Sequence, residues 1–244
     1  MARVEVHGNA ELDEPMLVEG MPGVGLVGKI AADHLVSTLD MTEYATCYCE
    51  GLPRVAIYSE GERQVRQPVR IYADETNDLL VLQSDVPVSP QAAPDFSTCV
   101  TGWFAQEGVT PICLSGLPQE KEGKPKLYGV GNGEGAELLE SQGIETPREG
   151  GMVSGPTGAL LAEACEQGVD CIGLVVQASA QFPDPEAARV LLVDAIEPLA
   201  GIEVDTDPLV EQAEEIADAR QQLAQQMRQA DEESTQAKPL GMYQ

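Results

Sequence analysis

Basic residues are scarce in this chain of 244 residues, which has 14 lysines and arginines against 41 aspartates and glutamates. Only five of the basic residues are lysines. The net charge of −27 repels phosphate backbones and anionic lipid headgroups, so it argues against nucleic acids and membrane surfaces as partners. A cytoplasm with a very high salt concentration would select such a surface, because salt screens the repulsion between like charges. We therefore expect a protein from a halophilic archaeon.

Long apolar runs are also missing, and aromatic residues are few. No apolar stretch approaches the roughly 18 residues that a membrane-spanning helix needs. The first residues alternate like a strand instead of forming a secretory leader, so we expect a cytoplasmic protein. With one Trp, three Phe and six Tyr, the core must consist mainly of Val, Leu, Ile and Ala.

The six cysteines form no C-x-x-C pair and no zinc-finger spacing. We expect all of them to be reduced and to serve as small buried apolar residues. The two histidines, His7 and His34, lie near no group of ligand residues in the sequence, so we expect neither a metal site nor a cofactor.

The pattern of apolar residues predicts strands that alternate with helices at both ends of the chain and a β-hairpin region in the middle. The strands are predicted at residues 2–7, 16–19, 41–50, 55–59, 65–73, 78–84, 109–114, 127–130 and 170–177, and the helices at 24–39, 96–107, 133–142, 154–167 and 185–199. The segments 55–59 and 65–73 would form a hairpin. This order favours a three-layer α/β/α sandwich with a mixed sheet over residues 1–203.

The last forty residues have a different pattern. A long amphipathic helix is predicted at residues 204–233, with a narrow apolar seam that would pack either on its own domain or on a second subunit. A mobile tail is predicted at residues 234–244. The tail ends in two large apolar residues, Met242 and Tyr243, beside the terminal carboxylate of Gln244, which suggests a plug for a pocket elsewhere.

A glycine-rich segment at residues 20–30 fits two phosphate-binding patterns. Gly23, Gly25 and Gly28 match G-x-G-x-x-G, and Gly23, Gly28 and Lys29 match the start of a P-loop. Ile30 stands where a P-loop needs a hydroxyl group for Mg²⁺. The strands after Glu50 also replace the helix and parallel strand of a dinucleotide fold. We therefore favour a packing role for these glycines.

The same segment resembles the N-terminal signature of the proteasome assembly chaperone family. The resemblance rests on Gly20, Pro22, Gly23, Gly25 and Gly28 in the run from Glu19, followed by Ala31-Ala32 and Leu35. Met21 stands where that family often has Phe. Looser matches are Tyr128-Gly129-Val130-Gly131-Asn132, Gly155-Pro156-Thr157-Gly158-Ala159-Leu160-Leu161 and Pro183-Asp184-Pro185-Glu186-Ala187-Ala188.

The resemblance implies an α/β/α sandwich without an established active site, a homo-oligomer, and proteasome α subunits as partners. Several such chaperones end in a hydrophobic residue, a tyrosine and any residue, and Met242, Tyr243 and Gln244 match that ending. We expect a non-enzymatic assembly chaperone or regulator that docks its tail between α subunits. The alternative is a nucleotide-binding enzyme of the ATP-grasp type that uses Gly23 to Lys29, and a structural oligomer with another client is a third hypothesis.

Overall fold

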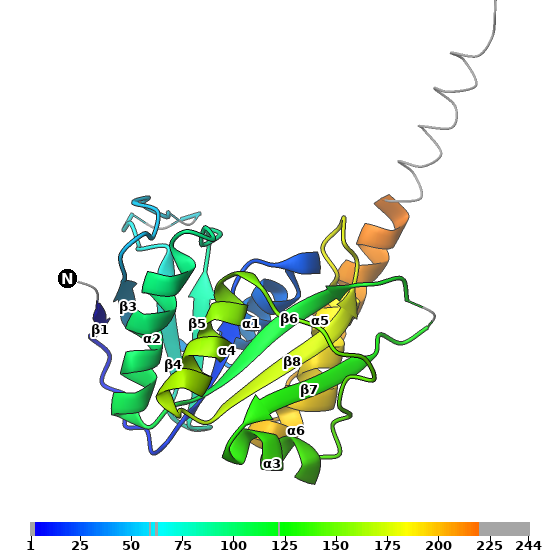
Figure 1. Ribbon diagram of the computed structural model, residues 1–244. Helices are drawn as coiled ribbons and strands as arrows, with labels where there is room; N and C mark the ends of the chain where they lie inside the picture. The colour runs from blue at the N-terminus through cyan, green and yellow to red at the C-terminus, as the bar shows by residue number, and fades with distance from the viewer. Residues whose placement is uncertain (1–2, 59, 62, 122, 220–244) are drawn as a thin grey trace, which may run out of the picture.

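The continuous apolar runs of the sequence become the central, parallel strands of one mixed sheet. A computed structural model describes residues 3–58, 60–61, 63–121 and 123–219 of the chain (Figure 1). Within these residues the sheet has eight strands in the order β1-β3-β4-β5-β2-β6-β8-β7. Neighbouring strands in the group β5-β2-β6-β8 are parallel, and the strands toward both edges pair antiparallel. Strands buried on both faces have this apolar pattern.

The strands and helices follow the predicted order closely. The strands are β1 (Arg3–Val6), β2 (Met16–Gly20), β3 (Thr42–Tyr48), β4 (Val69–Asp74), β5 (Leu79–Ser84), β6 (Thr110–Pro118), β7 (Leu127–Asn132) and β8 (Cys171–Ala178). The helices are the 3₁₀ turn η1 (Val24–Leu26), α1 (Val27–Thr38), α2 (Ala93–Glu107), α3 (Glu134–Ser141), α4 (Gly155–Gln167), α5 (Pro185–Leu191), the π-helical turn η2 (Leu192–Ile196) and α6 (Glu197–Ala200).

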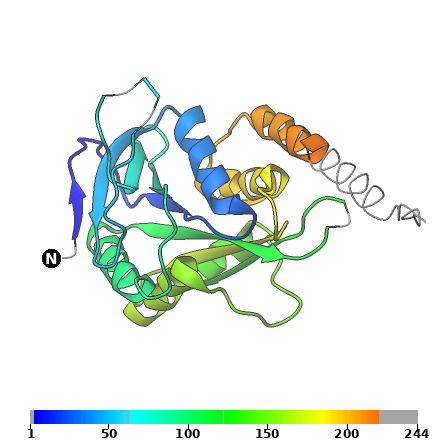
Figure 2. The same ribbon diagram turned by 90° about the horizontal axis from the view of Figure 1, so that it is seen from above.

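Helices cover both faces of the sheet, which confirms the predicted α/β class. Helix α1 packs beside α5 on one face, and α2 packs beside α4 on the other (Figure 2). Each face has its own apolar core: one includes Leu35 and Leu174, and the other includes Phe96 and Leu160. Helix α3 contacts β7 and β8.

The hairpin predicted in the middle of the chain is reduced to a single antiparallel bridge. Ile57 and Arg66 pair there through two backbone hydrogen bonds (2.9 and 2.8 Å), and the described residues between 51 and 68 are otherwise loop. The second strand is shorter than predicted, because β4 starts only at Val69, and it pairs with β3 and with the next strand of the chain, β5. The segment 55–59 is therefore not one of the strands of the sheet.

Two expectations about cysteines also need correction. Cys49 and Cys99 form a disulfide, with their Cα atoms 6.0 Å apart, so these two are not free thiols. Cys165 is exposed, whereas Cys47, Cys113 and Cys171 are buried as expected.

A helix at residues 207–219 follows the α/β body. It is the first part of the helix expected at 204–233; the remainder, and the tail at 234–244, lie outside the described residues. The start of the helix is held to α1, because the His34 side chain lies 2.6 Å from the carbonyl oxygen of Asp205. None of the described helices is both long and apolar enough to cross a membrane.

Candidate functional site at the glycine turn

A buried glutamate holds the start of the glycine turn, which we define as residues 20–28. Strands β2 and β6 pair as far as Glu19 and Cys113, and β2 then leaves β6, while Gly20 still pairs with Gln83 of β5. There the Glu19 carboxylate accepts hydrogen bonds from the backbone N–H groups of Met21 (3.2 Å) and Leu114 (3.1 Å). It also accepts one from the Thr157 hydroxyl on α4 (3.1 Å). Glu19 thus satisfies buried donors at the point where the strand ladder ends.

Complete burial changes the acidity of Glu19. Loss of hydration raises its pKa from 4.5 to about 8, although the three hydrogen bonds oppose this rise by favouring the carboxylate. At neutral pH the carboxyl group is therefore mostly protonated. Among 41 acidic residues the sequence offers no sign that this one differs, except that it sits within an apolar strand.

Two glycines of the turn allow α1 to lie directly on the sheet. A Cβ atom on Gly20 would stand 2.1 Å from the Cβ of Ala32 and 2.9 Å from the carbonyl oxygen of Gly28. A Cβ on Gly28 would stand 3.3 Å from the Cβ of Leu114. These short distances are the close approach that a packing role of glycine at the two positions requires.

The middle of the turn packs on the loop that follows β8. Gly25 has a φ of +63°, and a Cβ there would stand 3.1 Å from Ala178 and 3.2 Å from Asp184. The carbonyl oxygen of Gly25 accepts a hydrogen bond from the backbone of Asp184 (2.8 Å). The next residue, Leu26, also has a positive φ (52°), and its side chain is partly exposed. Because a left-handed conformation is costly for leucine, the surrounding contacts must impose it.

Asp184 organises that second loop. Its carboxylate caps α5 by accepting from the Ala187 N–H (3.1 Å), accepts from the Ser179 N–H (2.8 Å), and pairs with Lys121 (2.8 Å). The segments that contain Glu19, Thr157 and Asp184 are far apart in the chain and thus meet around one turn.

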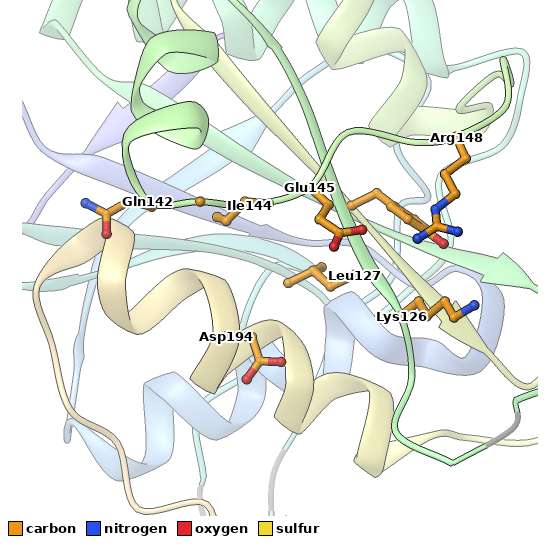
Figure 3. A pocket seen from close by; sticks show the side chains of 9 residues that line it. Lys126, Leu127, Gln142, Ile144, Glu145, Arg148 and Asp194 are labelled. Atoms are coloured by element: carbon orange, nitrogen blue, oxygen red, sulfur yellow. The ribbon is translucent and has the colours of Figure 1, made fainter.

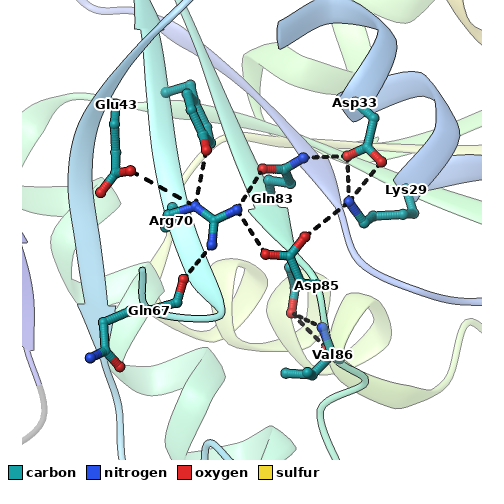
Figure 4. Close-up of polar contacts among 10 residues, drawn as sticks. Lys29, Asp33, Glu43, Gln67, Arg70, Gln83, Asp85 and Val86 are labelled. Atoms are coloured by element: carbon teal, nitrogen blue, oxygen red, sulfur yellow. Dashed lines mark hydrogen bonds and ion pairs between the residues drawn. The ribbon is translucent and has the colours of Figure 1, made fainter. Parts of the chain in front are cut away.

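Lys29, the lysine of the apparent P-loop, is neutralised by carboxylates of this chain. Its Nζ atom lies 2.5 Å from Asp33 and 3.3 Å from Asp85 (Figure 4). Asp85 pairs in turn with the buried Arg70 (2.7 Å), and Gln83 bridges Arg70 and Asp33. A lysine that already contacts two carboxylates has no free charge for a nucleotide phosphate.

The position of this network bears on the enzyme hypothesis. Open α/β sheets bind ligands where two neighbouring parallel strands send their following segments to opposite faces. Here β2 leads to α1 on one face, and its neighbour β5 leads to α2 on the other. The ends of these two strands carry the Lys29–Asp85 contact, so the chain's own ion pairs occupy the usual ligand crevice.

The remaining predicted site residues divide into two groups. Pro22 and Gly23 lie in the turn, but a Cβ on Gly23 would meet nothing within 4 Å, and its φ of −146° suits any residue. The structure gives no steric reason for glycine there. Met242, Tyr243 and Gln244, the expected partner-binding residues, lie outside the described residues.

Comparison with known proteins decides the family. The model of the PAC2 family matches residues 17–224. The chain belongs to the PAC2 family. An uncharacterized protein of Methanocaldococcus jannaschii is 28% identical over 218 residues, which cover 88% of each chain.

Solved structures with a similar fold include two proteins of Pyrococcus furiosus. Pyrococcus furiosus PbaA, an archaeal homolog of proteasome-assembly chaperone, is 26% identical with a TM-score of 0.79 over 95% of this chain and 96% of PbaA. P. furiosus PbaB, an archaeal proteasome activator, shares the fold at 23% identity, with a TM-score of 0.78 over 91% of this chain and 98% of PbaB.

This PAC2 protein also exposes apolar residues on the 51–68 loop. The side chains of Tyr58 and Val65 are 82% and 68% exposed. Neighbouring Arg54 and Arg63 are exposed as well. Apolar side chains flanked by cations on an otherwise acidic protein suit a contact with another protein surface. The sequence analysis missed this surface because it assigned the flanking segments to a paired hairpin.

Proposed function

We propose that this PAC2 protein is a non-enzymatic, cytoplasmic chaperone of proteasome assembly or a regulator of the core particle. Its similarity to PbaA, which extends over nearly the whole of both chains, is the observation that carries the proposal. The ion pairs of Lys29 with Asp33 and Asp85 support it, because they oppose a phosphate site in the glycine turn.

The C-terminal residues would make the contact with the proteasome. Tyr243 and Met242 would bury apolar area in a groove between neighbouring α subunits, at roughly 25 cal/mol per Å². The carboxylate of Gln244 would pair with a basic group in that groove. In Figure 1 the helix at 207–219 leads away from the body beyond the end of β8. Its anchored start at Asp205 supports a role in holding the tail away from the body.

A homo-oligomer would present several tails together. Linked tails bind with an effective concentration on the order of mM, so weak single contacts would add to a useful affinity. We propose the 51–68 loop as a subunit contact, with Tyr58 and Val65 buried and Arg54 and Arg63 facing the acidic surface of a second copy. A stable copy-to-copy contact buries roughly 800 Å² per partner, so neighbouring segments must also contribute.

Binding to purified proteasome α subunits at high salt tests the tail mechanism. Deletion of Met242–Gln244 should abolish capture of the α subunits and leave the melting temperature unchanged. The matched control keeps the composition and exchanges Tyr243 with Gln244, which moves the tyrosine out of its penultimate place and should also abolish capture. Undiminished capture by the deletion variant would refute tail docking; absence of capture by the full chain would refute the function.

A further inference from the structure

A pocket of about 350 Å³ lies away from the glycine turn, between β7 and the segment that follows α3. Its lining comes from Lys126 and the start of β7, from residues 142–148, and from Asp194 on η2 (Figure 3). This volume is at the lower end of the 300–1,000 Å³ range of small-molecule sites. The sequence gives no sign of it, because its parts are separated by up to 68 residues, from Lys126 to Asp194.

The backbone around the pocket is firmly held. Lys126 makes two hydrogen bonds with Gln177: its N–H donates to the Gln177 side-chain oxygen (3.0 Å), and its carbonyl oxygen accepts from the Gln177 N–H (2.9 Å). The Gly129 N–H donates to the carbonyl oxygen of Glu145 (2.9 Å). A Cβ on Gly129 would stand 2.9 Å from Ile144, so the segment lies directly on the strand. Such a shape exists before any ligand arrives.

Two cations of the pocket carry no ion pair with any described residue. Lys29, Arg70, Lys121 and Lys124 are all paired with carboxylates. The side chains of Lys126 and Arg148 have no such partner among the described residues, and both line this pocket. In a protein of net charge −27, two neighbouring unpaired cations in a concave site attract and concentrate a small anion.

The other side of the pocket has the opposite charge. Figure 3 shows Lys126 and Arg148 on one side of the pocket and Asp194 on the other. Glu145 and Leu127 lie between these two sides. Asp194 is already paired with Lys124 (2.7 Å), whereas Glu145 has no side-chain partner among the described residues. A dianion would be repelled by Glu145, but a carboxylate can bind the planar guanidinium of Arg148 through two hydrogen bonds.

We propose that this pocket binds a small amino-acid-like molecule, which has a carboxylate for Lys126 and Arg148 and an ammonium group for Glu145. Leu127 and Ile144 add apolar surface to the lining, with Leu127 near the middle of the pocket (Figure 3). The site is independent of the proposed tail contact.

Calorimetric titration of the full chain at constant ionic strength tests the proposal. The probes are L-leucine, acetate, methylammonium and inorganic phosphate. L-leucine should bind at least tenfold more tightly than each of the other three. R148Q and K126Q should each weaken its binding about tenfold, and E145Q should weaken L-leucine but not acetate. R3Q, which removes an exposed cation on β1 at the opposite edge of the sheet from β7, should have no effect.

Three results would overturn the assignment of the pocket to an amino-acid-like ligand. Equal affinity for phosphate and L-leucine would overturn the assignment, as would binding that R148Q and K126Q leave unchanged, or no measurable binding of any probe. All variants alter exposed side chains, and an unchanged circular dichroism melting curve establishes that each is folded.

Discussion

Replacing Glu19 with glutamine should remove a pH dependence of stability that originates beneath the glycine turn. The unfolded chain releases this proton near pH 4.5, and the folded chain releases it near pH 8. Between these values the folded state holds one more proton than the unfolded state, so stability falls as the pH rises. The stabilisation is complete below pH 4.5 and is lost by about pH 8.

The magnitude follows from the shift in pKa. A rise from 4.5 to about 8 corresponds to roughly 5 kcal/mol at 1.36 kcal/mol per pH unit. Between pH 5.5 and pH 8 the contribution should decline by roughly 3 kcal/mol. The glutamine variant lacks this titration, but its NH₂ group must face the N–H of either Met21 or Leu114. The free energy of unfolding of the variant at low pH should therefore be about 1–3 kcal/mol below that of the wild type, because one buried donor lacks a partner.

Urea unfolding of the wild type and E19Q from pH 5.5 to pH 9 provides the measurement. The free energies of unfolding should approach each other as the pH rises and cross by about pH 8–9, because only the wild type loses stability at Glu19, and it loses roughly as much as or more than the gap at low pH. E166Q, which changes an exposed glutamate of α4, should follow the wild type at every pH. Parallel pH curves for the wild type and E19Q would refute the raised pKa.

Three further predictions concern the turn and its surroundings. Gly20→Ala should destabilise the fold by about 3 kcal/mol in urea unfolding because its Cβ has no room, whereas Gly23→Ala should change stability by less than about 0.5 kcal/mol. Lys29→Met should cost roughly 1–2 kcal/mol, since it leaves Asp33 without a cation and Asp85 with Arg70 alone. MgATP should not raise the melting temperature of the wild type, and a rise that Lys29→Met removes would restore the enzyme hypothesis. Reduction of the Cys49–Cys99 disulfide, which spans 50 residues, should cost about 2–4 kcal/mol in calorimetry, and an unchanged melting temperature would contradict its stabilising role.

The order of strands and helices could be predicted because each element carries its own local pattern. The run from Leu79 to Leu82 is apolar throughout, and the structure buries it on both faces. The partner of each strand could not be predicted in the same way. Strand β4 pairs with β5 across a short turn, but its other partner, β3, is separated from it by the 51–68 loop.

The contacts around the candidate sites could not be predicted from the sequence, because they join residues that are far apart in the chain. Cys49 and Cys99 are 50 residues apart, and no spacing rule joins them. The hydrogen bond between Glu19 and Thr157 joins residues 138 positions apart. Burial also decides the state of Glu19, and a sequence with 41 acidic residues does not show which one is buried.

The glycine turn explains why a fold signature can look like a phosphate site. Both structures need glycine where a strand passes into a helix, one to admit a phosphate and the other to admit a neighbouring backbone. The surroundings distinguish them: Gly20 faces Ala32, Gly25 faces Asp184, and Lys29 faces two carboxylates. Groups of the chain itself thus occupy the surroundings of Gly20, Gly25 and Lys29, which argues against a nucleotide at the turn. That reasoning directs the experiments to the C-terminal residues, the 51–68 loop and the pocket at Lys126 and Arg148.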